Sequence, residues 1–219
     1  MAIDGPAASG KSAIGTLVAE HLSYRFVDTG AMYRAVTWLA LRRAIDIHDA
    51  AALADMAQRA GIRITTPPLG SAEATAVELD GEDATPHLRD PGVEANVSLV
   101  SSVPGVRSAL VRIQRALAAE GRIVMAGRDI GSVVLPDAPV KVYLDASTQV
   151  RARRRAEQLR AAGLETSEDA ILADLTRRDG LDSTREASPL TAAAGAVIIL
   201  TDDLTIEQVV GRILELARD

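Results

Sequence analysis

The segment Gly5-Pro6-Ala7-Ala8-Ser9-Gly10-Lys11-Ser12 places two glycines, a lysine and a hydroxyl at a spacing that suits phosphate chemistry. Gly, four free residues and then Gly-Lys-Ser/Thr is the pattern of loops whose backbone N–H groups cradle phosphates. Lys11 would add positive charge beside the β- and γ-phosphates, and the Ser12 hydroxyl would be a ligand for Mg²⁺. We therefore predict a nucleoside triphosphate site. It comprises Gly5, Pro6, Ala7, Ala8, Ser9, Gly10, Lys11, Ser12 and Ala13.

Arginines are the second set of residues that could bind phosphate. Every Lys or Arg residue except Lys11 and Lys141 is an arginine. A planar guanidinium holds a phosphate through two parallel hydrogen bonds, so converging arginines would bind a second phosphorylated substrate. For each arginine taken alone, the alternative interpretation is a solvated surface charge. The arginines that fall at predicted helix starts or in predicted loops are Arg34, Arg107, Arg128, Arg178 and Arg185.

Alternating strands and helices must bring these residues together. The apolar run 1–3 predicts a strand directly before the phosphate loop, and the spacing of Ile14, Val18 and Leu22 predicts a helix directly after it. Backbone N–H groups and the helix dipole then converge on one anion. Further strands are predicted over 24–27, 123–126, 140–144 and 197–200, and helices over 28–45, 49–60, 104–121, 148–162 and from Ser167 and Ile206. This order predicts a parallel sheet covered on both faces.

The middle of the chain interrupts the alternation. Strands are predicted over 62–65 and 75–79, separated by a break at 67–71, and Asp80-Gly81 is a dipeptide favoured in two-residue hairpins. We therefore expect a small insertion with its own short sheet. After it, Asp90-Pro91 predicts a helix cap followed by proline at the first helical position, while residues 178–185 are predicted to form a charged loop.

Composition excludes several classes of function. A net charge of −6 argues against a general nucleic-acid or membrane-surface binder. Because the chain has no cysteine, disulfides and thiolate metal sites are excluded, and His21, His48 and His87 lack partners at metal-ligand spacing. The longest run without a charged or strongly polar residue, 192–200, is too short to span a bilayer, and we find no secretory leader pattern. We expect a cytoplasmic protein.

Four motifs together resemble those of bacterial cytidylate kinases, and the similarity runs almost from end to end. They are Asp4-Gly5-Pro6, Asp28-Thr29-Gly30-Ala31-Met32-Tyr33-Arg34, Gly127-Arg128-Asp129-Ile130-Gly131 and Arg178-Asp179-Gly180-Leu181-Asp182-Ser183-Thr184-Arg185. The resemblance implies an α/β P-loop three-layer sandwich with a five-stranded parallel sheet. It also implies one domain over 1–219, with a core (about 1–60, 104–150 and 190–219), a nucleoside monophosphate-binding insertion (about 61–103) and a helical lid (about 151–189).

The implied activity is ATP-dependent and Mg²⁺-dependent phosphorylation of cytidine monophosphate, CMP, or deoxycytidine monophosphate, dCMP, to the diphosphate. By the same resemblance, Arg34, Arg128 and Arg185 hold the acceptor phosphate, Ser98, Arg107 and Asp129 read the cytosine, Arg178 and Asp182 bind the ribose, and Thr29 lies near the acceptor. The chemistry of the residues agrees, because a carboxylate can accept the exocyclic amino group of cytosine and a guanidinium suits its O2/N3 edge. Thr29 stands where some members carry serine, and it keeps the hydroxyl.

The implied lid begins with a run of arginines. Four-residue spacing puts Arg151 and Arg155 on one helix face, where they are candidates for stabilising charge on the transferring group. A solvated basic face is the alternative interpretation. With the lid arginines included, the residues expected to act on the phosphoryl group are Lys11, Arg128, Arg151, Arg155 and Arg178.

Two other functions fit a phosphate loop. One is a different small-molecule kinase, such as a uridylate, adenylate or shikimate kinase. The other is a nucleotide-dependent switch, but switch GTPases carry an Asn-Lys-x-Asp motif, and neither Lys11 nor Lys141 follows an asparagine. We therefore expect an enzyme rather than a switch. We further expect a monomer whose partners are small molecules rather than nucleic acids or membranes.

Overall fold

The computed structural model describes residues 1–67, 74–161, 163–185 and 187–218. Within them, five parallel strands form one sheet in the order β2-β6-β1-β7-β8, which confirms the predicted fold class. The central strand β1 is short but paired on both sides, with Ala2 opposite Met125 and Lys141. The strands of this sheet are β1 (Ala2–Asp4), β2 (Arg25–Asp28), β6 (Ile123–Gly127), β7 (Lys141–Asp145) and β8 (Val197–Leu200).

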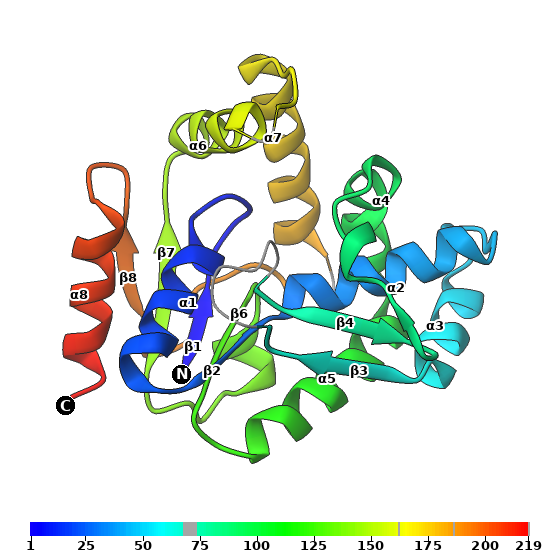
Figure 1. The fold of residues 1–219 in the computed structure, drawn as a ribbon, viewed down its shortest axis with the longest axis horizontal. Helices are drawn as coiled ribbons and strands as arrows, with labels where there is room; N and C mark the ends of the chain where they lie inside the picture. The colour runs from blue at the N-terminus through cyan, green and yellow to red at the C-terminus, as the bar shows by residue number, and fades with distance from the viewer. Residues whose placement is uncertain (68–73, 162, 186, 219) are drawn as a thin grey trace.

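Helices cover both faces of the sheet because its buried strands are apolar on both sides. On one face Ile3 packs in a core formed with helices α1 (Lys11–Leu22) and α8 (Ile206–Leu216). On the other face Ala2 packs in a core formed with helix α5 (Pro104–Ala119) and the π-helical turn Ile130–Val134. Figure 1 shows α8 and α5 at separate sides of the sheet.

A further core lies beside the sheet, where the sequence predicted the insertion. Within the described residues, an antiparallel sheet in the order β3-β4-β5 packs Val77 and Leu79 against Met32 and Leu53. The predicted hairpin at Asp80-Gly81 is confirmed, since both residues have positive φ angles, 52° and 85°. The elements here are α2 (Thr29–Arg42), α3 (Ala50–Arg59), β3 (Ile62–Thr65), β4 (Ala76–Leu79), β5 (Glu82–Asp83) and α4 (Pro91–Ser102).

Helices α6 (Thr148–Ala161) and α7 (Glu168–Thr184) pack against each other above the loop between β1 and α1 (Figure 1). The prediction of a charged loop over 178–185 was wrong, because α7 continues to Thr184. Arg178 and Asp182 lie four residues apart on one helix face, and ion pairs with other elements stabilise this last stretch. The division into core, insertion and lid stays a prediction.

Smaller differences concern helix ends. Helix α4 begins at Pro91 as expected, but the Asp90 carboxylate contacts the His87 ring instead of capping a backbone N–H in the described residues. Part of the predicted break at 67–71 and the predicted helix end at Ala162 lie outside the described residues. Among the helices that the structure describes, none has the length and apolar character needed to cross a membrane.

Candidate active site

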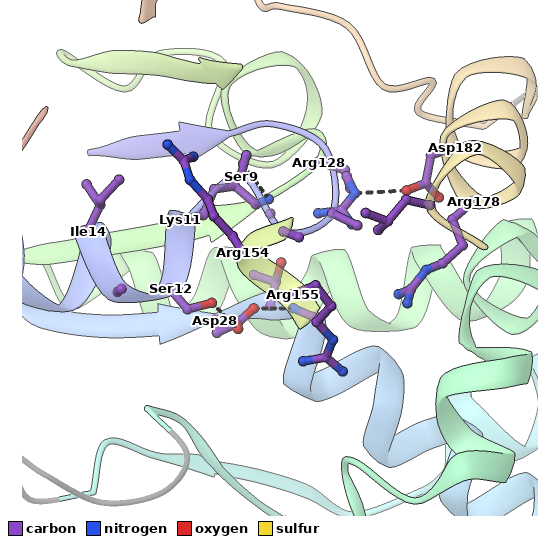
Figure 2. A pocket seen from close by; sticks show the side chains of 18 of the residues that line it. Ser9, Lys11, Ser12, Ile14, Asp28, Arg128, Arg154, Arg155, Arg178 and Asp182 are labelled. Atoms are coloured by element: carbon purple, nitrogen blue, oxygen red, sulfur yellow. Dashed lines mark hydrogen bonds and ion pairs between the residues drawn. The ribbon is translucent and has the colours of Figure 1, made fainter. Parts of the chain in front are cut away.

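A cavity of about 650 Å³ opens at the carboxyl edge of the central sheet, where α/β proteins bind their ligands. Figure 2 shows side chains from the phosphate loop, α6 and α7 around it. Gly5, Pro6 and Arg151 lie outside the set of described residues that line it. The predicted site residues that line it are Ala7, Ala8, Ser9, Gly10, Lys11, Ser12, Ala13, Thr29, Arg34, Ser98, Arg107, Arg128, Asp129, Arg155, Arg178, Asp182 and Arg185.

The phosphate loop joins β1 to the N-terminus of α1. Gly10 caps the helix with φ of 91°, in the left-handed region. A Cβ on Gly5, whose φ is 149°, would lie 2.1 Å from the Leu144 carbonyl oxygen, so a larger residue would displace the loop. Lys11 is buried, and its Nζ donates to the Pro6 carbonyl at 2.6 Å and to Ser9 Oγ at 3.3 Å. Burial, followed by the nearby Arg128 charge, lowers the pKa of Lys11.

Asp28 connects the phosphate loop with α2. One carboxylate oxygen accepts the Ser12 hydroxyl at 2.8 Å, and the other accepts the Gly30 N–H at 2.9 Å as the helix cap that the sequence predicted. Burial raises the pKa of Asp28, but Arg34 and the Ser12 hydroxyl outweigh it and hold the pKa below its usual value. An ionised carboxylate beside a hydroxyl is a suitable oxygen pair for a hard divalent cation.

Asp182 of α7 orients two of the predicted phosphate-binding arginines. Arg128 Nε lies 2.8 Å from one Asp182 oxygen (dashed in Figure 2), and Arg185 Nη1 lies 3.7 Å from the other. Arg128 also donates to the Gly5 carbonyl at 3.1 Å, which places it directly beside the phosphate loop. Although burial raises the pKa of Asp182, Arg128 and Arg185 hold it below its usual value, so the carboxylate stays ionised.

Glu94 of α4 lies among the remaining arginines of the acceptor side. Its carboxylate is 3.2 Å from Arg34 Nε and 3.0 Å from Arg178 Nη1. Burial raises the pKa of Glu94, but these guanidinium groups bring it down to about 2. Sequence reasoning missed Glu94, although its spacing of four residues from Ser98 places both on one face of the helix.

The predicted cytosine readers come together deep in the cavity. Arg107 of α5 forms a buried ion pair with Asp129 and donates to the Ser101 carbonyl at 3.2 Å. The Arg107 guanidinium also lies 5.2 Å from the centre of the Tyr33 ring. Ser98 lines the same cavity from the neighbouring helix α4. The pair therefore offers both a carboxylate and a cation toward one planar ligand.

The two arginines predicted to act together from α6 have different surroundings. Arg151 is buried, and its guanidinium donates to the carbonyls of Ala146 at 2.9 Å and Ala7 at 3.1 Å and to Asp179 at 2.6 Å. It therefore holds the phosphate loop from outside the cavity. Arg155, one turn later, lines the cavity and donates to Gln158 at 2.8 Å. The expected joint action on the phosphoryl group thus has geometric support for Arg155 rather than Arg151.

Two further groups were missed from the sequence. An apolar end of the cavity lies beside the phosphate loop and α8, where Arg154 donates to Thr201 Oγ1 at 2.9 Å. The sequence signal for this end of the cavity was the short connection, residues 201–205, between the predicted strand over 197–200 and the predicted helix from Ile206. Residues lining the apolar end are Ile14, Arg154, Thr201, Leu204, Thr205, Ile206 and Val209.

The second group is Asp4. Its carboxylate accepts the backbone N–H groups of Ile130 and Gly131, each at 2.7 Å.

Asp4 therefore fixes the turn that follows Arg128 and Asp129. Burial raises the pKa of its carboxyl to about 6, against the lowering effect of the two backbone hydrogen bonds. Asp4 belongs to the motif Asp4-Gly5-Pro6, but the sequence alone does not show that Asp4 meets Ile130 and Gly131, which lie far along the chain.

A parallel sheet with a phosphate loop after its central strand, and arginines across the same cavity, defines a P-loop protein that binds phosphorylated ligands. The chain belongs to the cytidylate kinase family, whose sequence profile matches residues 1–219. It is 49% identical to the cytidylate kinase of Herpetosiphon aurantiacus, over 99% of this chain and 93% of the relative. It is also 49% identical to that of Mycolicibacterium paratuberculosis, over 100% and 94%. The resemblance found in the sequence is therefore confirmed.

Likeness to a solved structure extends to the fold alone. The crystal structure of an uncharacterized protein from Eubacterium ventriosum aligns with a TM-score of 0.52 at 12% identity, covering 100% of this chain and 97% of that one.

Proposed function

We propose that this protein transfers the γ-phosphoryl group of ATP to CMP or dCMP, releasing ADP and the corresponding diphosphate. The observation that carries the proposal is that the phosphate loop lines one cavity together with Arg34, Arg128 and Arg185 in a member of the cytidylate kinase family. Two anionic ligands bound there would meet with their phosphates facing each other.

The donor nucleotide would bind through the phosphate loop. Backbone N–H groups at the start of α1 face the phosphates, and Lys11 exchanges its contacts to Pro6 and Ser9 for phosphate oxygens. The apolar end of the cavity, where Ile14, Leu204 and Val209 lie, suits the flat apolar surface of the adenine ring.

The residues at the start of α1 also suit Mg²⁺. Ser12 Oγ and the Asp28 carboxylate supply hard oxygen atoms, and the described residues contain no cluster of three or more His, Cys, Asp or Glu side chains that could hold a metal by itself. This agrees with Mg²⁺ sites built from one or two protein oxygens plus substrate phosphates. When bound, Mg²⁺ supplies positive charge to the β- and γ-phosphate oxygens.

The acceptor would bind on the opposite side of the cavity. Arg34, Arg128 and Arg185 hold its phosphate, and Arg178 and Asp182 bind its ribose. Asp129 accepts the cytosine amino group, while Arg107 and Ser98 face its acceptor edge. Thr29 is buried, and its hydroxyl donates to the Ala126 carbonyl at 2.8 Å, so it shapes the wall beside the acceptor.

Transfer requires no side chain as base, because the attacking phosphate oxygen is already ionised at neutral pH. The protein must align donor and acceptor, offset their repulsion and exclude water. Lys11, Arg128 and Arg155 supply positive charge at the point of transfer, with Arg178 beside them. Helices α6 and α7 act as a lid that closes when both nucleotides are bound. Solution scattering without compaction in the presence of both nucleotides would contradict this closure.

An ADP-release assay with Mg-ATP tests the proposal directly. CMP and dCMP should be turned over faster than uridine or adenosine monophosphate. Uracil presents a carbonyl oxygen where cytosine presents the amino donor that Asp129 accepts, and adenine is a larger, two-ring base. Preference for another acceptor, including shikimate, would refute the assignment. We further propose that the enzyme acts as a cytoplasmic monomer on small molecules, without nucleic acid or membrane, which sedimentation of the purified protein tests for the monomer.

A further inference from the structure

Glu94 occupies a position in the acceptor side of the cavity that no role in the proposed reaction explains. Its side chain is 19% exposed and points among guanidinium groups from three different segments: Arg34 of α2, Arg178 of α7 and Arg89 from the turn before α4. The respective distances are 3.2, 3.0 and 3.4 Å. One carboxylate therefore forms ion pairs with three guanidinium groups, and through Arg178 it also connects α7 with α4.

This carboxylate leaves part of the cluster unfilled. Arg34 Nη1 and Arg178 Nε are buried without a hydrogen-bond partner among the described residues. The same is true of Nη2 of the nearby Arg185, whose ion pair is with Asp182 rather than Glu94. A carboxylate has two acceptor oxygens and one negative charge, whereas a phosphate monoester has three terminal oxygens and close to two charges at neutral pH. The cluster thus offers more donors and more positive charge than Glu94 uses.

We propose that Glu94 is the resident counter-ion of the acceptor-phosphate subsite. Between substrates its carboxylate neutralises Arg34 of this subsite and the neighbouring Arg178, which is proposed to bind the ribose. The phosphate of the incoming acceptor then takes the place of the carboxylate beside Arg34. Buried arginines without an anion would be costly, so Glu94 keeps the cluster assembled when the subsite is empty. The acceptor must displace it, so Glu94 weakens acceptor binding and increases KM. This role rests on the proposed function.

Replacing Glu94 with glutamine tests the proposal, because the change keeps the shape of the side chain and removes its charge. Glu94→Gln should lower the KM for CMP by roughly fivefold or more, since the phosphate no longer competes with a carboxylate. Inorganic phosphate, titrated by calorimetry in the presence of saturating Mg-ADP to fill the phosphate loop, should bind more tightly by a similar factor.

Glu120→Gln is the matched control. Glu120 lies 2.7 Å from Arg25 at the end of α5, it is 63% exposed, and it is outside the described residues that line the cavity. The Glu120→Gln variant loses the same charge as Glu94→Gln, but far from the cavity. Its KM for CMP should therefore equal that of the wild-type protein. A similar fall in KM for both variants would assign the effect to net charge and overturn the proposal.

An increased KM, or weaker phosphate binding, in Glu94→Gln would show that Glu94 orients the arginines for the substrate, and unchanged values would show that it does not occupy the subsite. Either result overturns the proposal. Glu94→Ala replaces Glu94→Gln if the glutamine variant does not fold. If the unchanged protein does not phosphorylate CMP, the proposed function fails, while the phosphate titration still decides the role of Glu94.

Discussion

Arg107 of α5 and Asp129 at the end of β6 form an ion pair in which 4% and 5% of the side chains are exposed. The two residues belong to elements that pack on each other only in the folded protein. Each therefore has two tasks, because each neutralises a buried partner and each is proposed to contact the cytosine. A substitution at either position should change stability and specificity together.

We expect Asp129→Ala to reduce kcat/KM for CMP, because a specific polar contact to the base is lost. The reduction should correspond to a loss of about 1 to 3 kcal/mol in transition-state stabilisation. It should also lower the free energy of unfolding by about 3 kcal/mol, because Arg107 remains buried without its partner. ATP binding should change little. Steady-state kinetics with CMP and UMP and denaturant unfolding measure these effects. Equal losses for every acceptor would show that Asp129 does not read the base.

The double variant Arg107→Met with Asp129→Ala separates the two tasks. Removing both charges should restore much of the lost stability, since no unpaired ion remains. Selectivity for CMP over UMP should stay low. A double variant as unstable as the single one would mean that the ion pair is not what stabilises this region.

We expect Lys11→Ala to abolish turnover with every acceptor, because Lys11 is the charge nearest the phosphates within the loop. Near-normal rates would refute the donor site. Lys141→Ala is the matched control, since Lys141 is the other lysine of the chain and its Nζ lies 3.4 Å from the Ala194 carbonyl in an exposed contact. ADP release under saturating Mg-ATP compares the two variants.

Replacing Arg151 by alanine should mainly reduce stability, whereas replacing Arg155 by alanine should mainly reduce turnover. Arg151→Ala should lower the free energy of unfolding by about 3 kcal/mol, because it removes the buried contacts to Ala7 and Asp179. Arg155→Ala should change the free energy of unfolding by about 0.5 kcal/mol or less but lower kcat at least about tenfold.

Arg153→Ala is the control for both, because Arg153 is exposed on the same helix. Thermal melting and single-turnover rates measure the two effects. If Arg155→Ala destabilised the protein as much as Arg151→Ala, the separate roles assigned to the two arginines would be wrong.

Asp4 should give stability a recognisable dependence on pH. Burial raises the pKa of Asp4 from 3.8 to about 6 in the folded protein. Between these values the folded state holds a proton that the unfolded state has lost, so the contribution of Asp4 to stability falls as pH rises. Asparagine does not titrate. The unfolding free energy of the wild-type protein minus that of Asp4→Asn should therefore decrease from pH 4 to pH 6.5, as measured by urea titrations. If this difference stays constant or increases with pH, the pKa of Asp4 is not raised.

The fold and the phosphate loop could be predicted because their signals are local. Gly10 and Lys11 stand at fixed spacing in one loop, and Asp80-Gly81 specifies its hairpin through the φ angles of two adjacent residues. Much of the cavity lining followed from motifs at predicted strand ends, where a parallel sheet gathers side chains from distant parts of the chain.

What the sequence could not reveal depends on contacts between elements. The last turns of α7 carry many charged residues, which is typical of a loop. Their helical form depends on ion pairs with other elements, those of Asp182 with Arg128 and of Arg178 with Glu94. Equal spacing made Arg151 and Arg155 look equivalent, although one faces the phosphate loop and the other the cavity. Glu94 has no local motif, because its environment consists of arginines from other segments.

The two oxygens of Asp28 serve different elements, since one receives the Ser12 hydroxyl and the other caps α2, the helix that carries Arg34. If Ser12 turns toward a bound cation, Asp28 loses one hydrogen bond, and we expect its cap on the N-terminus of α2 to change as well. The affinities for the two nucleotides should consequently be thermodynamically linked, with each substrate changing the dissociation constant of the other by the same factor.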